Sequence, residues 1–302
     1  MVWAACAACI VGIIAAIGWL VTAPRPAFTA DSTSLFDQAG DARRGEQVFL
    51  AGDCASCHAS PGQEDRLRLG GGLALASPFG TFRVPNISSD PTDGIGAWTT
   101  KDLANALLSG VSPDGSHYYP VFPYSSYAHL TIEDVADLLA YLRSLPAVSG
   151  RAPPHDINPL FSIRRFLGFW KLLYFRPGKI APDPAHDEQW NRGRYLVEAA
   201  GHCAECHSSR DAFGGIKDKT RFAGGRDPVG TGFYPNITPA RIGHWSQADL
   251  AEMLMSGNTP DHGRVGSSMA DVVTNTAQLS QADRDAIAAY IKSLPARPTE
   301  RP

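Results

Sequence analysis

The pattern of apolar and polar residues divides the chain into two parts. The first is a short apolar run, and in the longer second part short segments with periodic apolar residues alternate with loops. The opening run, residues 2–23 (VWAACAACIVGIIAAIGWLVTA), has no charge and is long enough to cross a hydrocarbon core of about 30 Å as a helix. It lacks the basic start of a secretory signal peptide and is longer than the apolar part of one. We therefore expect an uncleaved transmembrane anchor over residues 1–24, with a cleaved signal peptide as the alternative.

Four later segments with helical periodicity begin with the same start signal, a hydroxyl residue three positions before an acidic one. This spacing is typical of a capping box. The predicted helices begin after Thr99, Thr131, Ser246 and Ser280. Prolines at 146 and 295 would end the second and the fourth of these helices. The pattern predicts an all-α fold.

The periodic segments occur in matching pairs, which indicates a tandem duplication. FGTFRVPNIS (79–88) matches VGTGFYPNIT (229–238), GIGAWTTKDLANALLSG (94–110) matches RIGHWSQADLAEMLMSG (241–257), and LTIEDVADLLAYLRSLPA (130–147) matches LSQADRDAIAAYIKSLPA (279–296). We predict one domain over residues 41–148 and a second over residues 189–302. Residues 25–40 would link the anchor to the first domain, and residues 149–188 would link the two domains.

Two of the three C-x-x-C pairs continue into a histidine, as CASCH (54–58) and CAECH (203–207), which is the attachment signature of c-type haem. Two thiols one helical turn apart can form thioethers with the haem vinyl groups, and the adjacent histidine can bind the iron. A zinc site or a redox dithiol would leave these histidines unexplained. We therefore predict two covalently bound haem c groups. Their cysteines would be Cys54, Cys57, Cys203 and Cys206, and their proximal iron ligands would be His58 and His207.

The remaining composition argues for little other chemistry. Cys6 and Cys9 lie in the apolar run without a histidine, and we interpret them as small apolar residues of a helix. A net charge of −3 does not favour nucleic-acid binding, which requires a basic surface. Neither a dinucleotide-binding fingerprint nor a nucleophile paired with a base is present, so we predict no catalytic residues.

The duplication also locates the expected sixth ligands of the two irons. Met269 lies in a predicted loop, thirteen residues after the serine of the SG pair at 256–257. Its place resembles that of the iron-binding methionine in class I cytochromes c, and this resemblance implies that Met269 is the ligand of the second haem. The same count in the first half reaches Phe122, which cannot bind iron. His117, five residues earlier, is the preferred substitute. His129, a tyrosine of the same loop, and a vacant or water-bound site remain alternatives.

Four further residues are candidates for the haem environment. Trp98 and Trp245 directly precede two of the helix starts, so each indole can pack as a hydrophobic staple or donate its N–H to a haem propionate. Asn86 and Asn236 occupy the same place in the PNIS and PNIT motifs.

Each half resembles a class I cytochrome c domain, and the whole resembles the membrane-bound cytochrome c subunits of bacterial periplasmic alcohol and gluconate dehydrogenases. CASCH and CAECH, PNIS and PNIT, GIGAW and RIGHW, YYPVFPYSSYAHLTIEDVADLLAYL, and the closing YLRSLP and YIKSLP carry the resemblance, which covers residues 41–297. It departs in one respect, because those subunits typically have three haem domains and this chain has two.

The resemblance implies an electron carrier in the bacterial inner membrane, with a single N-terminal span and haem domains in the periplasm. A periplasmic dehydrogenase subunit would donate electrons, and a quinone, a cytochrome c or a terminal oxidase would accept them. Because methionine ligation raises the haem potential, the first haem should have the lower potential, so electrons should run from the N-terminal to the C-terminal domain. The alternative is a dihaem enzyme, of the peroxidase or thiosulfate-oxidising type, with an open first haem.

The interdomain linker contains an aromatic segment, NPLFSIRRFLGFWKLLYFRPG, over residues 158–178. One interpretation is a helix that packs across both domains. The other is an interfacial helix, or a docking surface for a dehydrogenase. The exposure of Trp170 should distinguish them.

Overall fold

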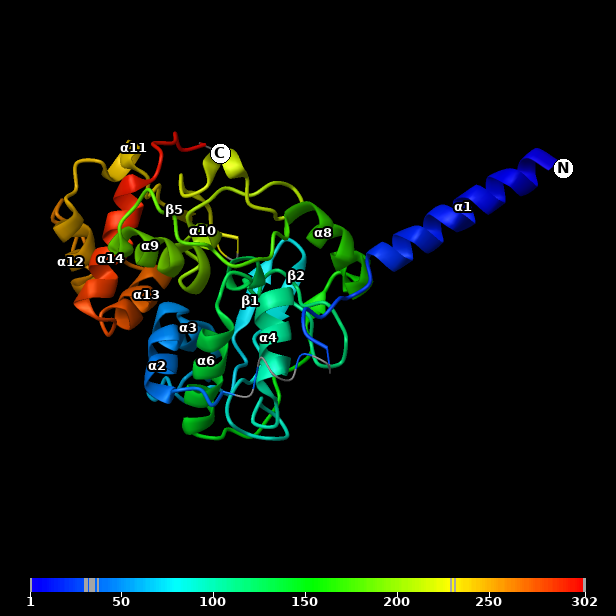
Figure 1. The fold of residues 1–302 in the computed structure, drawn as a ribbon, viewed down its shortest axis with the longest axis horizontal. Coiled ribbons are helices and arrows are strands. Elements are labelled where there is room, and N and C mark those ends of the chain that lie inside the picture. Colours follow the sequence, from blue (N-terminus) through cyan, green and yellow to red (C-terminus); the bar gives the residue numbers. More distant parts are fainter. Residues whose placement is uncertain are drawn as a thin grey trace.

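The computed structural model describes residues 2–29, 32, 36, 38–228, 230 and 232–300. Two helical halves lie side by side, and one long helix projects from the first of them (Figure 1). Parts of the predicted 25–40 linker, Val229 and Thr231 of the second repeat, and the last two residues of the predicted 189–302 domain lie outside the described residues.

The projecting helix is α1 (Val2–Val21), whose described side chains are exposed along most of its length. Thr22, at its foot, is buried against the body. In the part of the chain that the structure describes, no helix is both long enough and apolar enough to cross a membrane. The transmembrane anchor expected over residues 1–24 is therefore not confirmed.

The two halves repeat one order of helices. The first contains α2 (Ala42–Ala51), α3 (Cys54–His58), α4 (Thr100–Ser109), α5 (Tyr124–Tyr127) and α6 (Ile132–Ser144). The second contains α9 (Glu188–Tyr195), the π-helical turn η3 (Leu196–Ala200), α10 (Cys203–Cys206), η4 (Asp218–Thr220), α11 (Pro239–Ile242), α12 (Gln247–Ser256), α13 (Ser268–Thr276) and α14 (Gln281–Ser293). The four helices predicted from start signals are α4, α6, α12 and α14, and all four are confirmed.

Two small sheets qualify the all-α prediction. Strands β1 (Ala74–Ser77), β2 (Gly80–Arg83) and β3 (Asp156–Ile157) form an antiparallel sheet in the order β1-β2-β3. Strands β4 (Gly225–Arg226) and β5 (Phe233–Tyr234) form an antiparallel pair in the second half. The strands are only two to four residues long, which is at or below the shortest run in which a strand period can be recognised.

In each half the first and last helices cross at a glycine. Gly45 of α2 lies against the backbone of Asp137 in α6, and Gly193 of α9 lies against the backbone of Ala286 in α14. A Cβ atom at either glycine would clash with the facing carbonyl oxygen. The same close contact at a glycine therefore packs the first helix against the last helix in both halves.

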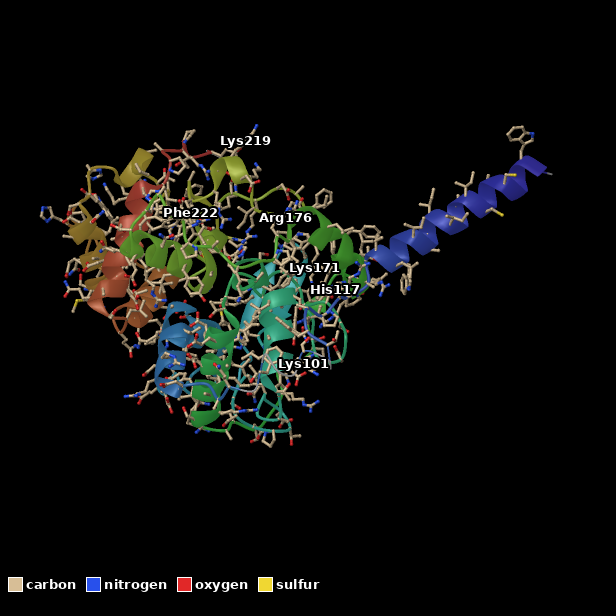
Figure 2. All side chains as sticks on the ribbon, in the orientation of Figure 1. Lys101, His117, Lys171, Arg176, Lys219 and Phe222 are labelled. Atoms are coloured by element: carbon tan, nitrogen blue, oxygen red, sulfur yellow. The ribbon has the colours of Figure 1, made fainter. Side chains whose placement is uncertain are left out.

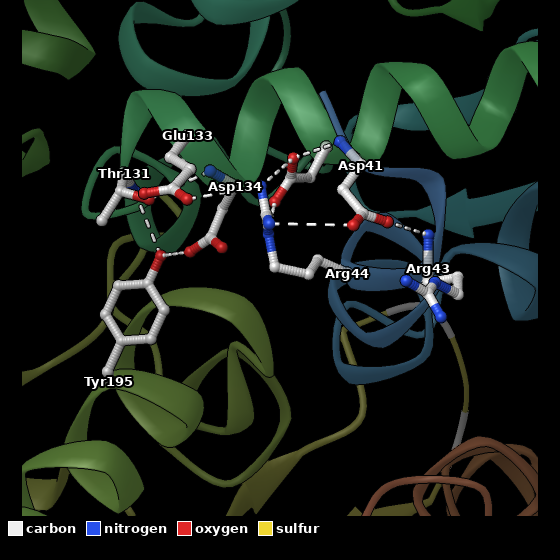
Figure 3. Close-up of polar contacts among 8 residues, drawn as sticks. Asp41, Arg43, Arg44, Thr131, Glu133, Asp134 and Tyr195 are labelled. Carbon is white, nitrogen blue, oxygen red and sulfur yellow. Dashed lines mark hydrogen bonds and ion pairs between the residues drawn. The ribbon is translucent and has the colours of Figure 1, made fainter. Parts of the chain in front are cut away.

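Two of the four predicted capping boxes are complete, at Thr99 and at Ser246. In the other two the hydroxyl caps its helix, but the acidic side chain does not accept the return hydrogen bond from the N-cap backbone. Asp134 accepts a hydrogen bond from the Tyr195 hydroxyl of α9, which itself accepts one from the Thr131 N–H at 3.1 Å (Figure 3). These bonds join α6 of the first half to α9 of the second.

A second polar cluster joins α2 to α6 beside this contact (Figure 3). The buried carboxylate of Asp137 accepts hydrogen bonds from Arg44 Nε and from the Asp41 N–H, both at 2.6 Å. Arg44 also lies 3.4 Å from Glu133. A buried carboxylate requires such partners, so the cluster fixes the crossing of the two helices.

The linker contains α7 (Pro159–Ser162), η2 (Arg164–Phe166) and α8 (Leu167–Tyr174), and α8 lies at the foot of α1 (Figure 1). Half-buried Trp170 donates its indole N–H to Phe213 O of the second half at 3.1 Å. Lys171 Nζ donates to Ser109 O of the first half at 2.7 Å. The interpretation of a helix that packs across both domains is confirmed for this face of α8.

Candidate haem-binding sites

Each C-x-x-C-H motif lies on a short helical turn, α3 or α10, that follows a residue in the left-handed region. Asp53 has φ 50° and His202 has φ 41°. The left-handed residue reverses the chain between the preceding helix and the motif. The two cysteines of each motif then lie one turn apart, as thioethers to the two vinyl groups require.

The motif histidines have matching partners. His58 Nδ1 lies 2.9 Å from Pro85 O, and His207 Nδ1 lies 2.7 Å from Pro235 O. A carbonyl oxygen can only accept, so Nδ1 carries the proton and Nε2 keeps its lone pair. Burial lowers the pKa of His58 to about 4 and also lowers the pKa of His207. Both imidazoles are neutral at pH 7 and are oriented in the way that a metal-binding histidine requires.

One continuous cavity of about 2700 Å³ spans both halves and is lined by all four motif cysteines and both motif histidines. Single ligand sites usually occupy about 300–1,000 Å³, so this volume can hold two large groups. Burial raises the pKa of Cys54 and of Cys203 to about 12, so both thiols are protonated at neutral pH. The thiols, the oriented imidazoles and the apolar cavity together fit two haem c groups.

The two attachment turns meet at the centre of the molecule. A Cβ atom added at Gly52 would lie 3.6 Å from Ala200 O, and one added at Gly201 would lie 3.6 Å from Ala51 O. His202 Nε2 lies 3.2 Å from Gly52 O. Each motif therefore begins beside the other.

Asn86 and Asn236 are buried and line the cavity, and their amides bind backbone. Asn86 Nδ2 donates to Val148 O at 2.6 Å, and Asn236 Nδ2 donates to Arg297 O at 2.8 Å. Each asparagine thus fastens the end of its own half to the loop that supplies the histidine-orienting carbonyl. Sequence reasoning missed the orienting role of Pro85 and Pro235, although the repeated PN pair was the signal that could have found it.

Trp98 and Trp245 also line the cavity. The Trp245 Nε1–H donates to Asp261 Oδ2 at 3.0 Å. That donor is therefore already used, and the propionate contact considered for Trp245 gains no support. The staple interpretation is compatible with the hydrophobic core, in which both indoles pack on the cluster that contains Leu103 and Leu250.

The sixth-ligand candidates differ between the halves. Met269 is the second residue of α13, rather than a loop residue, and lines the cavity. Phe122 lines the cavity in the first half. His117 is only 2% exposed, yet it is not among the lining residues, and its Nε2 lies 2.9 Å from Thr22 O at the foot of α1. This placement gives no support to His117 as an iron ligand. His129 Nδ1 lies 2.5 Å from Gly178 O, and this backbone contact gives no support to His129 as an iron ligand.

The comparisons with known proteins agree with the duplicated geometry. The cytochrome c family model matches residues 42–146 and again residues 191–295. A diheme cytochrome c-type protein of Cereibacter sphaeroides is 55% identical over 261 residues, which cover 85% of this chain and 87% of the relative.

Two subunits of larger proteins are also similar. The fructose dehydrogenase cytochrome subunit of Gluconobacter japonicus is 39% identical over 260 residues, which cover 84% of this chain and 52% of the relative. The cytochrome c subunit of the quinone alcohol dehydrogenase of Gluconacetobacter polyoxogenes is 36% identical over 272 residues, which cover 85% of this chain and 56% of the relative. The chain thus matches only about half the length of these two subunits.

Proposed function

The chain belongs to the cytochrome c family and carries two covalently bound haem c groups, and from this premise we propose that it is a membrane-attached electron carrier between a periplasmic dehydrogenase and the respiratory chain. The observation that carries the proposal is the duplicated pair of neutral histidines, each oriented by a proline carbonyl in one shared cavity. Haem c supplies one-electron chemistry at its iron when it is bound.

The protein's own residues have defined roles in this proposal. Cys54 and Cys57 would hold the first haem and Cys203 and Cys206 the second, while His58 and His207 would bind the irons through Nε2. Met269 would be the further iron-binding residue of the second haem. In the first half the equivalent position is Phe122, which lines the cavity and has no lone pair to offer.

This inequality sets the expected direction of electron flow. Thioether ligation stabilises ferrous iron and raises the potential, so the second haem should accept electrons from the first. The adjacent attachment turns, which meet at Gly52 and Gly201, support a direct transfer between them. The fixed protein around each haem would limit structural reorganisation when the charge of that haem changes.

The relatives and α1 support the proposed partners and location. Because two relatives are named as cytochrome subunits of dehydrogenases, a periplasmic dehydrogenase is the proposed donor. A quinone, a cytochrome c or a terminal oxidase is the proposed acceptor. The exposed apolar side chains of α1 support attachment to the bacterial inner membrane, with the haem-bearing halves in the periplasm.

The test uses the full-length holoprotein, prepared in a bacterial host that attaches haem c. We expect two haems per chain, retention in the membrane fraction after an alkaline wash, two distinct potentials in a redox titration, and rapid oxidation of the reduced protein by soluble ferricytochrome c or a short-chain quinone. Turnover of peroxide or thiosulfate by the holoprotein would instead favour a dihaem enzyme.

A further inference from the structure

The outer face of α8 is apolar and exposed. Phe166, Phe169, Leu172 and Leu173, here called the α8 face, fall on one side of the helix because three- and four-residue spacings share a side. Leu172 and Leu173 are 55% and 59% exposed. Gly168 packs against Thr22, and Lys171 binds the first half. Phe166, Phe169 and Leu173 also border the haem cavity, whereas Leu172 does not.

The α8 face has a fixed position relative to α1. Gly168 packs directly on the backbone of Thr22, with no room for a Cβ atom between them. The Arg165 guanidinium lies 4.3 Å from the centroid of the Trp19 ring and donates a hydrogen bond to Trp19 O. The foot of α1 is thereby fastened to the start of α8.

His117 and Lys171 complete this junction from the first half, and Figure 2 labels both near the foot of α1. His117 Nε2 donates to Thr22 O, while Lys171 Nζ donates to Gly110 O at 2.8 Å, just beyond the end of α4. Carbonyl groups at the end of a helix require such donors. The junction therefore holds α1, α8 and the first half as one unit.

The charge of the linker is one-sided. Between residues 158 and 182 the sequence contains five basic residues and no acidic residue, although the whole chain has a net charge of −3. Two of the five, Arg176 and Lys179, follow α8 directly and are exposed. Exposed apolar side chains with basic residues beside them are features of a segment that lies in the interface of a bilayer and is attracted to anionic lipid.

We propose that the α8 face rests on the lipid surface of the membrane at the point where α1 meets it. The occupant is lipid because the α8 face meets the exposed apolar surface of α1 beside Trp19, where a Cβ atom added at Gly18 would lie 3.6 Å from the Phe169 ring. The inference rests on the proposed membrane attachment through α1. Two attachment points at a rigid junction would hold the mouth of the haem cavity at a constant height above the bilayer.

The test measures the alkylation of single cysteines by a charged, water-soluble maleimide. The background is full-length holoprotein with Cys6→Ser and Cys9→Ser, in which thioethers block the four motif cysteines. Leu172→Cys reports the α8 face, Ile14→Cys reports α1, and Lys219→Cys is the control in the second half, away from α1 (Figure 2). Unchanged haem content shows that each variant folds.

Vesicles of phosphatidylglycerol and phosphatidylcholine should slow the alkylation of Cys at positions 172 and 14 several-fold and leave position 219 unchanged. Protection at position 14 alone would overturn the inference while leaving the membrane attachment intact. Absence of protection at both positions would overturn the attachment itself. If position 172 is protected by a purified dehydrogenase without lipid, and not by vesicles, the α8 face is a protein-docking surface and the lipid proposal is wrong.

Discussion

The loops that follow α4 in the first half and α12 in the second have the same backbone conformation at their start, but different elements cover them. Each loop begins at a glycine in the left-handed region, Gly110 with φ 59° and Gly257 with φ 77°. Each then closes through a single β-bridge with the same spacing, from Val111 to His117 and from Asn258 to Arg264. His117 and Arg264 are therefore structurally equivalent, and five residues after them stand Phe122 and Met269.

Their environments explain the different side chains. Arg264 is exposed, whereas α1 and α8 cover the first loop and bury His117 against Thr22. The equivalence shows that position 117 belongs to the closure of the loop and not to the ligand position further along. The first half has adapted this loop to attach α1, and the second half has kept Met269 at the cavity.

The largest effect is expected from removing one attachment motif at a time. Cys54→Ala with Cys57→Ala, or Cys203→Ala with Cys206→Ala, should halve the covalent haem per chain and leave the spectrum of the other half. The haem content of the denatured protein in pyridine measures this. Cys6→Ala with Cys9→Ala is the control and should retain both haems. Full haem content in either motif variant would contradict the assignment.

Single substitutions at the equivalent positions Phe122 and Met269 test the inequality of the haems. Met269→Ala should lower the potential of the second haem, and Phe122→Met should raise that of the first, each by more than about 59 mV, which is a tenfold change for one electron. Redox titration with low-temperature spectra separates the two centres. If Met269→Ala leaves both potentials unchanged, Met269 is not a ligand.

His117 and Arg264 provide a matched pair of substitutions. His117→Ala removes a buried donor and leaves Thr22 O without it, so we expect a loss of about 1–3 kcal/mol in the free energy of unfolding. Arg264→Ala at the exposed equivalent should change that free energy by less than about 0.5 kcal/mol. Denaturant unfolding measures both. The visible spectrum should be unchanged in His117→Ala, and a shift to high spin would restore His117 as the ligand of the first haem.

The smallest expected effect is that of pH on the stability of the protein. Burial lowers the pKa of His117, and the charges of Lys171 and Arg165 act in the same direction, while the hydrogen bond to Thr22 opposes them. The unfolded chain then binds the proton more readily, so this contribution to stability is present above a pH of about 6.5 and is lost as the pH falls below it. The difference in melting temperature between wild type and His117→Gln should therefore narrow in acid. A difference independent of pH would contradict a buried neutral His117.

Much of the fold could be predicted because its signals are local. Capping residues stand within one turn of the helices they start, so α4, α6, α12 and α14 could be located without tertiary information. The diversion of Asp134 to Tyr195 could not be predicted, because the two residues are 61 positions apart. The short strands and the glycine crossings at Gly45 and Gly193 likewise have no local pattern that distinguishes them from loops or ordinary helix glycines.

The sequence by itself determined the chemistry of this protein, since C-x-x-C-H places two thiols and an imidazole within five consecutive residues and duplication repeats the unit. The spacing between the halves also identified Met269 and Phe122 as equivalent. Only the tertiary structure decided where His117 points. Its partner, Thr22, lies 95 residues away, and no count along the chain can show that α1 returns to cover this loop.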